Sequence, residues 1–317
     1  MDFQKLDSII SDYIRKNKFY IDTLPMVTDY SKKVLSEEFF DVNNEWSRKM
    51  DINESIDIVY RFLQSIDTSM ANQFMNIMNS KDTNNNPYVN ILPRSEYPDG
   101  KDEVSEGKVF IYCDNSPNDA FVILHEMLHK MNEAYFTNQF NFPDETLTRD
   151  YMGETVSILG EMMLGKYMVE NRIITENDFN MRKNFRINEA KEDARDVIIE
   201  NELINLKLQG KDISYDNLSD LFNKYNECFD EYSVLKDEAN DLRRINKILN
   251  NDDLSLRKSQ RYVIAQVVSN DMLKRDTLKQ DFLQLYNEVG NVNSDLRNVY
   301  NTIISKSESS KSKMMGE

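Results

Sequence analysis

The segment over residues 125–129 decides the expected fold, and it reads His125-Glu126-Met127-Leu128-His129. It contains both histidines of the 317-residue chain. Residues four positions apart lie one turn above each other on a helix, so both imidazoles can face one ion. Glu126 then lies beside the ion without binding it. The sequence therefore predicts a metal-binding helix; the alternative is a partly buried helix that carries two histidines incidentally.

The HExxH pattern on a helix is typical of zinc metallopeptidases, in which the glutamate is the general base. A catalytic zinc typically takes three protein ligands and leaves a fourth position to water. Because the chain has no further histidine, the third ligand must be a different residue type. Cys113 could coordinate as a thiolate, but two histidines with one glutamate form a well-attested catalytic set. We therefore expect a carboxylate.

Several acidic residues downstream of the motif could supply this carboxylate: Glu133, Asp144, Glu145, Asp150, Glu154 and Glu161. Glu133 follows His129 on the same helix, where the axis carries its side chain away from the ion. The two acids beside Pro143 are expected in a loop. A second helix that crosses the first is a stiffer platform, and Glu154 lies on such a helix with Ser157 and Glu161 on its face. Glu154 is the predicted third ligand.

The arrangement of prolines, glycines and apolar residues predicts a mainly helical chain. All six prolines lie at or before Pro143, so the second half should be nearly all helix. Helical spacing predicts helices over residues 3–17, 28–39, 52–65, 67–79, 148–171 and 176–208. Turn residues between 84 and 116 surround short β-prone runs at 88–92 and 108–113, the one convincing strand region.

The strand region leads directly into the motif helix. The run over 108–113 is followed by Ser116, a suitable N-cap, and by Pro117, which suits the first helical position. A strand beside the motif helix can supply backbone hydrogen bonds to an extended substrate, although an ordinary hairpin is an equal alternative. We thus expect a mainly α fold with a small β-sheet or hairpin beside the HExxH helix.

Three regions are predicted along the chain: an N-terminal helical region over 1–83, a metal-binding region over 84–304 and a polar, flexible tail over 305–317. The metal-binding region combines the small sheet at 84–116 with a helical body.

Composition narrows the class of partner. Asp and Glu total 55 against 39 Lys and Arg, which gives a net charge of -16 that repels phosphate backbones and argues against nucleic acid. The acidic surface could favour cationic peptides or serve solubility. No secretory signal or membrane span is apparent, so we expect a cytoplasmic protein, with secretion by a non-classical route left open. Cys113 and Cys228 are expected to be reduced thiols.

A family resemblance follows when the motif is taken together with a later segment, Gly153-Glu154-Thr155-Val156-Ser157-Ile158-Leu159-Gly160-Glu161. The pair resembles the thimet oligopeptidase and oligoendopeptidase F family of gluzincins, helical zincin-like peptidases in which the glutamate ligand opens an E-x-x-S-x-x-x-E pattern. The resemblance implies one Zn²⁺ per chain, held by His125, His129 and Glu154. Ser157 and Glu161 either orient a ligand or cap and pair on the helix surface.

The resemblance covers roughly residues 108 to 285 of a chain that is much shorter than typical members. It continues more weakly through two further segments, Leu208-Gln209-Gly210-Lys211-Asp212-Ile213-Ser214 and Arg261-Tyr262-Val263-Ile264-Ala265-Gln266. In the latter, family members carry a histidine and tyrosines that stabilise the oxyanion. Here Tyr262 is the candidate, while Ile264 and Gln266 stand where tyrosines are expected. Asn132 occupies the position of a third histidine.

These features predict a zinc-dependent peptidase that acts on peptides or proteins. Glu126 would take a proton from a zinc-activated water and deliver it to the departing amine. The rival interpretation is a catalytically weak or inactive zinc-binding interaction protein, which the missing tyrosines and histidine permit but which needs no Glu126. Hydrolysis of a non-peptide amide uses the same residue types and stays open.

Overall fold

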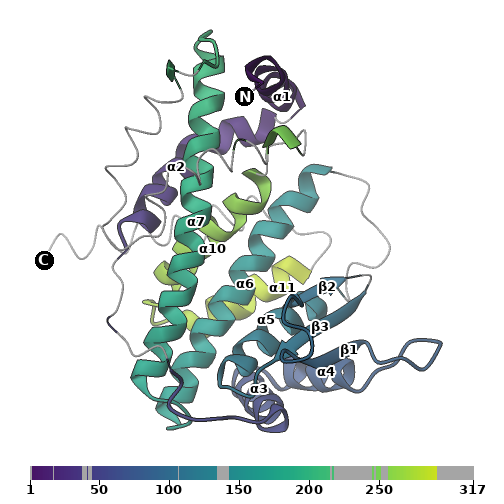
Figure 1. The fold of residues 1–317 in the computed structure, drawn as a ribbon. Coiled ribbons are helices and arrows are strands. Elements are labelled where there is room, and N and C mark those ends of the chain that lie inside the picture. Colours follow the sequence, from purple (N-terminus) through teal and green to yellow (C-terminus); the bar gives the residue numbers. More distant parts are fainter. Residues whose placement is uncertain are drawn as a thin grey trace, which may run out of the picture. The chain divides into compact units, whose positions relative to one another are not determined.

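The computed structural model (Figure 1) is mainly helical with one small sheet, which confirms the coarse fold prediction. It describes residues 2–16, 18–37, 41, 45–105, 107–133, 143–214, 216–217, 245, 248–250 and 256–290. The predicted tail over 305–317 lies outside these residues. Among the described helices, none is both long and apolar enough to cross a membrane.

The chain forms two compact units, each built from two separate stretches. The first comprises Met1–Phe39 and Arg186–Val267, and the second comprises Phe40–Phe185 and Val268–Glu317. The division does not coincide with the predicted boundary between residues 83 and 84. Helices over residues 52–78 pack against the motif helix and therefore belong to its unit. The second unit also contains the whole HExxH segment and Glu154.

Four helices precede the sheet. They are α1 (Phe3–Lys16), α2 (Lys18–Leu35), α3 (Ile52–Ile66) and α4 (Thr68–Met78). Three of them agree with the predicted ranges to within a residue or so at each end. The predicted start of the second helix at residue 28 is wrong by ten residues, because α2 continues through Pro25. A proline inside a helix removes a hydrogen bond and usually ends the helix, so this continuation has no local signal.

The sheet has three strands in the order β1-β3-β2. They are β1 (Val89–Pro93), β2 (Glu103–Ser105) and β3 (Lys108–Cys113). β1 runs parallel to β3 and β2 runs antiparallel to it, so β2 and β3 form a hairpin. The two predicted strands are confirmed. β2 was not predicted, because three residues are too short to show an alternating pattern.

The motif helix is α5 (Asn118–Glu133), and it begins one residue after the predicted position. Ser116 acts at its start as predicted, since its Oγ accepts a hydrogen bond from the backbone N–H of Asn118 at 3.2 Å. The Asp119 carboxylate accepts hydrogen bonds from the backbone N–H groups of Asp114 and Asn115. The turn between β3 and α5 is therefore fixed by side chains at the start of the helix.

The later helices are α6 (Pro143–Glu170), α7 (Glu176–Leu208), α10 (Leu256–Met272) and α11 (Leu278–Gly290). α7 has the predicted bounds, and Gly210 follows it with a φ of 70°. α6 begins five residues before the predicted start. The expectation that Asp144 and Glu145 lie in a loop is therefore wrong, because Pro143 opens the helix as its first residue.

The core of the second unit surrounds α5, which packs against α6, α3, α11 and β3. Large apolar side chains of this core are fully buried, among them Phe62, Phe121, Leu124 and Phe282. α5 and α6 approach closely at Gly160, where an added Cβ would lie 2.6 Å from Leu128 Cδ1. At Gly153, on the same helix, an added Cβ would lie 3.8 Å from His129 Nδ1, an ordinary contact.

The close approach at Gly160 gives a stability prediction. Leu128 is fully buried, so Gly160→Ala forces it out of its position, and we expect a loss of about 1–3 kcal/mol in the free energy of unfolding. Gly153→Ala is the matched control, expected to leave stability unchanged or to raise it by about 0.5–1 kcal/mol. Urea unfolding followed by circular dichroism measures both. Equal effects of the two substitutions would show that the helices are not in close contact at Gly160.

Candidate metal centre

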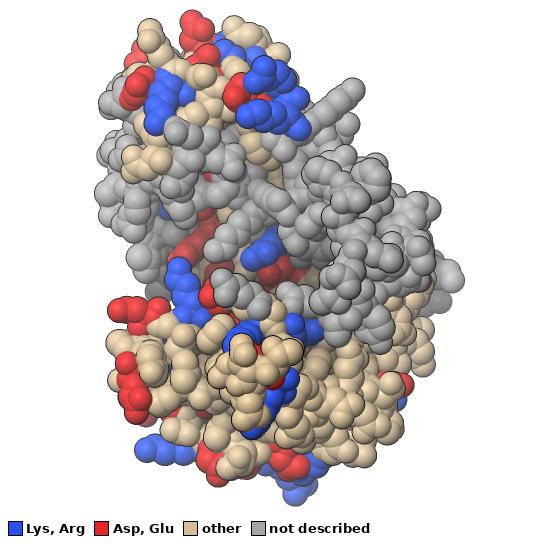
Figure 2. Space-filling view, turned by 90° about the vertical axis from the view of Figure 1, so that its right-hand side faces the viewer, with Lys and Arg blue, Asp and Glu red and all other residues tan. Residues whose placement is uncertain are grey.

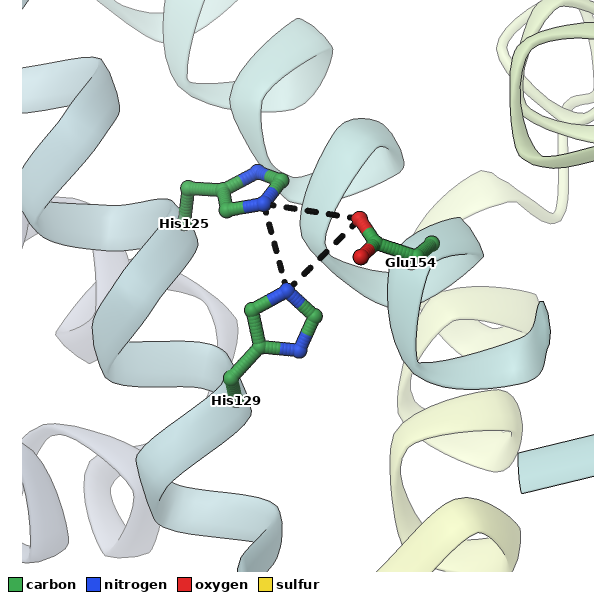
Figure 3. Close-up of side chains that lie close together, drawn as sticks. All are labelled: His125, His129 and Glu154. Carbon is green, nitrogen blue, oxygen red and sulfur yellow. Dashed lines mark hydrogen bonds and ion pairs between the residues drawn. The ribbon is translucent and has the colours of Figure 1, made fainter. Parts of the chain in front are cut away.

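The candidate metal centre consists of His125 and His129 from α5 and Glu154 from α6 (Figure 3). The two Nε2 atoms lie 3.2 Å apart. Glu154 Oε2 lies 3.5 Å from Nε2 of His125 and 3.6 Å from Nε2 of His129. The three residues expected from the sequence to form one site thus converge from two crossing helices.

The size of this triangle fits a small divalent ion. Ligand atoms bound tetrahedrally at about 2.0–2.1 Å from zinc lie about 3.3 Å from each other. The three measured separations of 3.2, 3.5 and 3.6 Å lie close to this value. Two imidazole nitrogens and one carboxylate oxygen also form a donor set that zinc uses in catalytic sites. The donor types and their spacing could therefore hold such an ion.

The carboxylate of Glu154 is buried, and the whole residue is 3% exposed. Burial raises the pKa of this carboxyl, but the neighbouring His129 and His125 outweigh burial and hold the pKa well below its usual range. A lowered pKa favours the ionised carboxylate, which is the form that binds a metal ion.

Glu126 also lies on α5 and is 8% exposed. Burial raises its pKa above the usual value, and the nearby His125 and His129 oppose this effect. A carboxylate whose pKa is raised by burial is a better proton acceptor near neutral pH than an exposed one. Its position next to a predicted ligand, together with this environment, is suitable for a general base.

Two residues of the E-x-x-S-x-x-x-E pattern contact His125. Glu161 Oε1 lies 2.6 Å from His125 Nδ1, and the Ser157 hydroxyl donates a hydrogen bond to the His125 carbonyl oxygen at 3.3 Å. Both side chains are fully buried, so the alternative of a capping or pairing role on the helix surface does not apply. A carboxylate that accepts from Nδ1–H directs the lone pair of Nε2 toward the ion.

Arg182 on α7 contacts the same carboxylate and was not predicted. Its Nε and Nη2 donate to Glu161 Oε2 at 2.9 and 2.6 Å. Three carboxylates are buried in and beside the centre, those of Glu126, Glu154 and Glu161, and Arg182 brings one positive charge. A divalent ion would place positive charge beside these carboxylates, which is a second reason why the site suits one. A lone arginine within a helix gives no sequence signal of this role.

Cys113, the alternative ligand, does not belong to the described centre. Cys113 is a free, buried thiol at the end of β3 and lies outside the cluster of His125, His129 and Glu154. Burial raises the pKa of this thiol to about 12, which favours the protonated form over the thiolate that binds a metal. The side chains of four other candidates lie outside the described residues: Glu133, Asp144, Glu145 and Asp150.

Tyr262, the predicted oxyanion donor, lies on α10 in the first unit. Its hydroxyl accepts a hydrogen bond from Arg261 Nη2 at 3.1 Å, and the Arg261 guanidinium lies 4.8 Å from the centroid of its ring. Ile264 and Gln266, which stand where tyrosines were expected, are both buried. The role of Tyr262 stays a prediction, because the metal centre belongs to the second unit.

Comparison of the chain with protein-family models, with curated proteins and with solved structures gives no match. The geometry and chemistry of the site therefore support the functional conclusion, together with the motif that first indicated it.

Proposed function

We propose that the chain is a zinc-dependent metallopeptidase of the gluzincin type that hydrolyses peptide bonds in peptides or proteins. The observation that carries the proposal is the triangle formed by His125, His129 and Glu154, with Glu126 between the two histidines in sequence and buried. A purely structural metal site needs only its ligands. It would have no use for Glu126, a buried carboxylate beside the ion that is not one of the three predicted ligands.

The chain's own residues would divide the work of hydrolysis. His125, His129 and Glu154 hold the ion, and Glu161 fixes the orientation of the first imidazole through Nδ1. Zinc, when bound, supplies Lewis acidity that activates a water and polarises the scissile carbonyl. Glu126 takes the water proton and then delivers it to the departing amine, so one residue serves as base and acid.

We also propose that the fold is zincin-like. Two features support this assignment: a small mixed sheet lies beside the HExxH helix, and that helix crosses the helix that carries the glutamate ligand. β2 is an edge strand of this sheet and contacts α5, so an extended peptide could pair with it near the site. On the face that Figure 2 shows, the described basic and acidic side chains are interspersed. Together with the net charge of -16, this supports a peptide or protein substrate rather than nucleic acid. We also propose a cytoplasmic location.

The second candidate is a zinc-binding interaction protein with little or no activity. The burial of Ile264 and Gln266 at the positions expected for oxyanion-stabilising tyrosines favours it. In that case the ion would stabilise the fold or a binding surface, and Glu126 would have no chemical role.

A measurement of zinc content together with cleavage of a quenched fluorescent peptide library separates the two candidates. The peptidase is expected to hold one zinc per chain and to lose cleavage with a chelator, with recovery when zinc is added back. One zinc without turnover would support the interaction protein. A chain that binds no zinc would refute both.

A further inference from the structure

Arg182 is a buried residue of α7 that contacts Glu161 beside the metal centre. It is 3% exposed, and its guanidinium uses three nitrogen atoms for hydrogen bonds. Nε and Nη2 donate to Glu161 Oε2, and Nη1 donates to Asn118 Oδ1 at 2.9 Å. The guanidinium carbon also lies 5.4 Å from the ring centroid of Phe121. Together these contacts hold the guanidinium in one orientation, because the group is planar and its N–H donors point in fixed directions.

The contacts form a continuous path from α7 to the metal-binding nitrogen. Arg182 contacts Oε2 of Glu161, and the other oxygen of the same carboxylate lies 2.6 Å from Nδ1 of His125. With Oε2 bound by two donors of Arg182, the carboxylate plane is fixed and Oε1 is directed at the imidazole. The imidazole is then held with Nε2 toward Glu154 and His129.

We infer that Arg182 is a positioning residue for the metal centre, which acts on the ion through Glu161 and His125. The inference rests on the proposed function. It differs from a general packing role, because a packing role would lower the stability of the unit without acting specifically on the imidazole. Residues that orient a metal-binding histidine typically change metal affinity by 10- to 100-fold when removed.

Competition with a fluorescent zinc chelator measures the affinity of the full-length chain and its variants. Arg182→Gln and Glu161→Gln are each expected to weaken zinc binding by about 10- to 100-fold. The double variant should bind zinc no more weakly than the weaker single variant, because both residues act along one path. Arg61→Gln is the matched control, because Arg61 pairs with Asp57 at 2.6 Å on the surface of α3. The zinc affinity of this variant should equal that of the wild type.

A second readout addresses the imidazole directly. The chain has two histidines, so ¹⁵N-histidine labelling of the zinc-saturated protein gives a spectrum of two residues. The Nδ1–H signal of His125 should lie downfield and be protected from exchange in the wild type and in Arg61→Gln. In Arg182→Gln it should shift upfield or disappear through exchange with water. If Arg182→Gln does not fold, Arg182→Lys is the second variant. Lysine retains the positive charge but lacks the planar guanidinium, so the Nδ1–H signal of His125 should change in the same way to a smaller degree.

The outcomes separate the two claims. If the wild type binds zinc and the Arg182 variants keep its affinity and its Nδ1–H signal, the positioning role is refuted while the metal centre stands. Losses that multiply in the double variant would also refute it, because they would show independent actions. If the wild type binds no zinc, the proposed function fails and the positioning role fails with it.

Discussion

Glu126→Gln is expected to abolish peptide cleavage and to leave zinc bound. Glutamine has nearly the same shape as glutamate, so the buried position in α5 keeps its packing, but the amide cannot take a proton from water. Because general acid–base catalysis by one residue contributes about 10²- to 10⁴-fold, the turnover rate should fall by at least that range. Cleavage of the quenched peptide library and zinc content, measured on the same samples, test the two halves of this expectation.

Glu96→Gln is the matched control for that substitution. Glu96 is exposed in the connection between β1 and β2, so the same change of charge is made away from the metal centre. Its activity should equal that of the wild type. Full activity in Glu126→Gln would remove Glu126 from the mechanism, whereas loss of zinc in that variant would show that it acts as a ligand instead.

Glu154→Gln is expected to lose most of the affinity for zinc and, with it, the cleavage activity. A neutral amide oxygen is a weaker zinc ligand than a carboxylate. Residue 154 is also buried, so a side chain from the surface could not take its place as the third ligand. The affinity should fall by more than the 10- to 100-fold loss that is typical of residues outside the ligand set. Chelator competition measures the affinity directly.

Thermal unfolding gives an independent measure of the same substitution. A ligand that binds the folded chain stabilises it by about 2.7 kcal/mol when its free concentration is 100 times the dissociation constant. Zinc at such a concentration should therefore raise the Tm of the wild type and leave that of Glu154→Gln nearly unchanged. An equal rise in both proteins would mean that the stabilising ion is bound elsewhere.

Much of the candidate site could be predicted because its residues follow from periodicity within two helices. The spacing of His125 and His129 places both on one face of α5, and the preference for a second helix selects Glu154 from several acids. Glu161 contacts His125 for the same reason, since it lies on the same face of α6 as the ligand. These relations depend on local geometry, which a sequence carries.

The features that were missed have no local signal in the sequence. Arg182 is recognisable only when α7 packs so that its guanidinium meets Glu161. Pro25 lies inside α2 although its local preference is to end a helix, and β2 is too short for a periodic pattern. Local sequence patterns therefore do not indicate these three features.

A crystal structure of zinc-loaded Glu126→Gln with a peptide selected from the library tests the central claim most directly. Anomalous scattering at the zinc edge should give one ion per chain, bonded to Nε2 of His125, Nε2 of His129 and the Glu154 carboxylate. The scissile carbonyl of the peptide should lie beside that ion, with the side chain at position 126 next to it. An ion held by other residues, or a peptide bound away from the ion, would contradict the account.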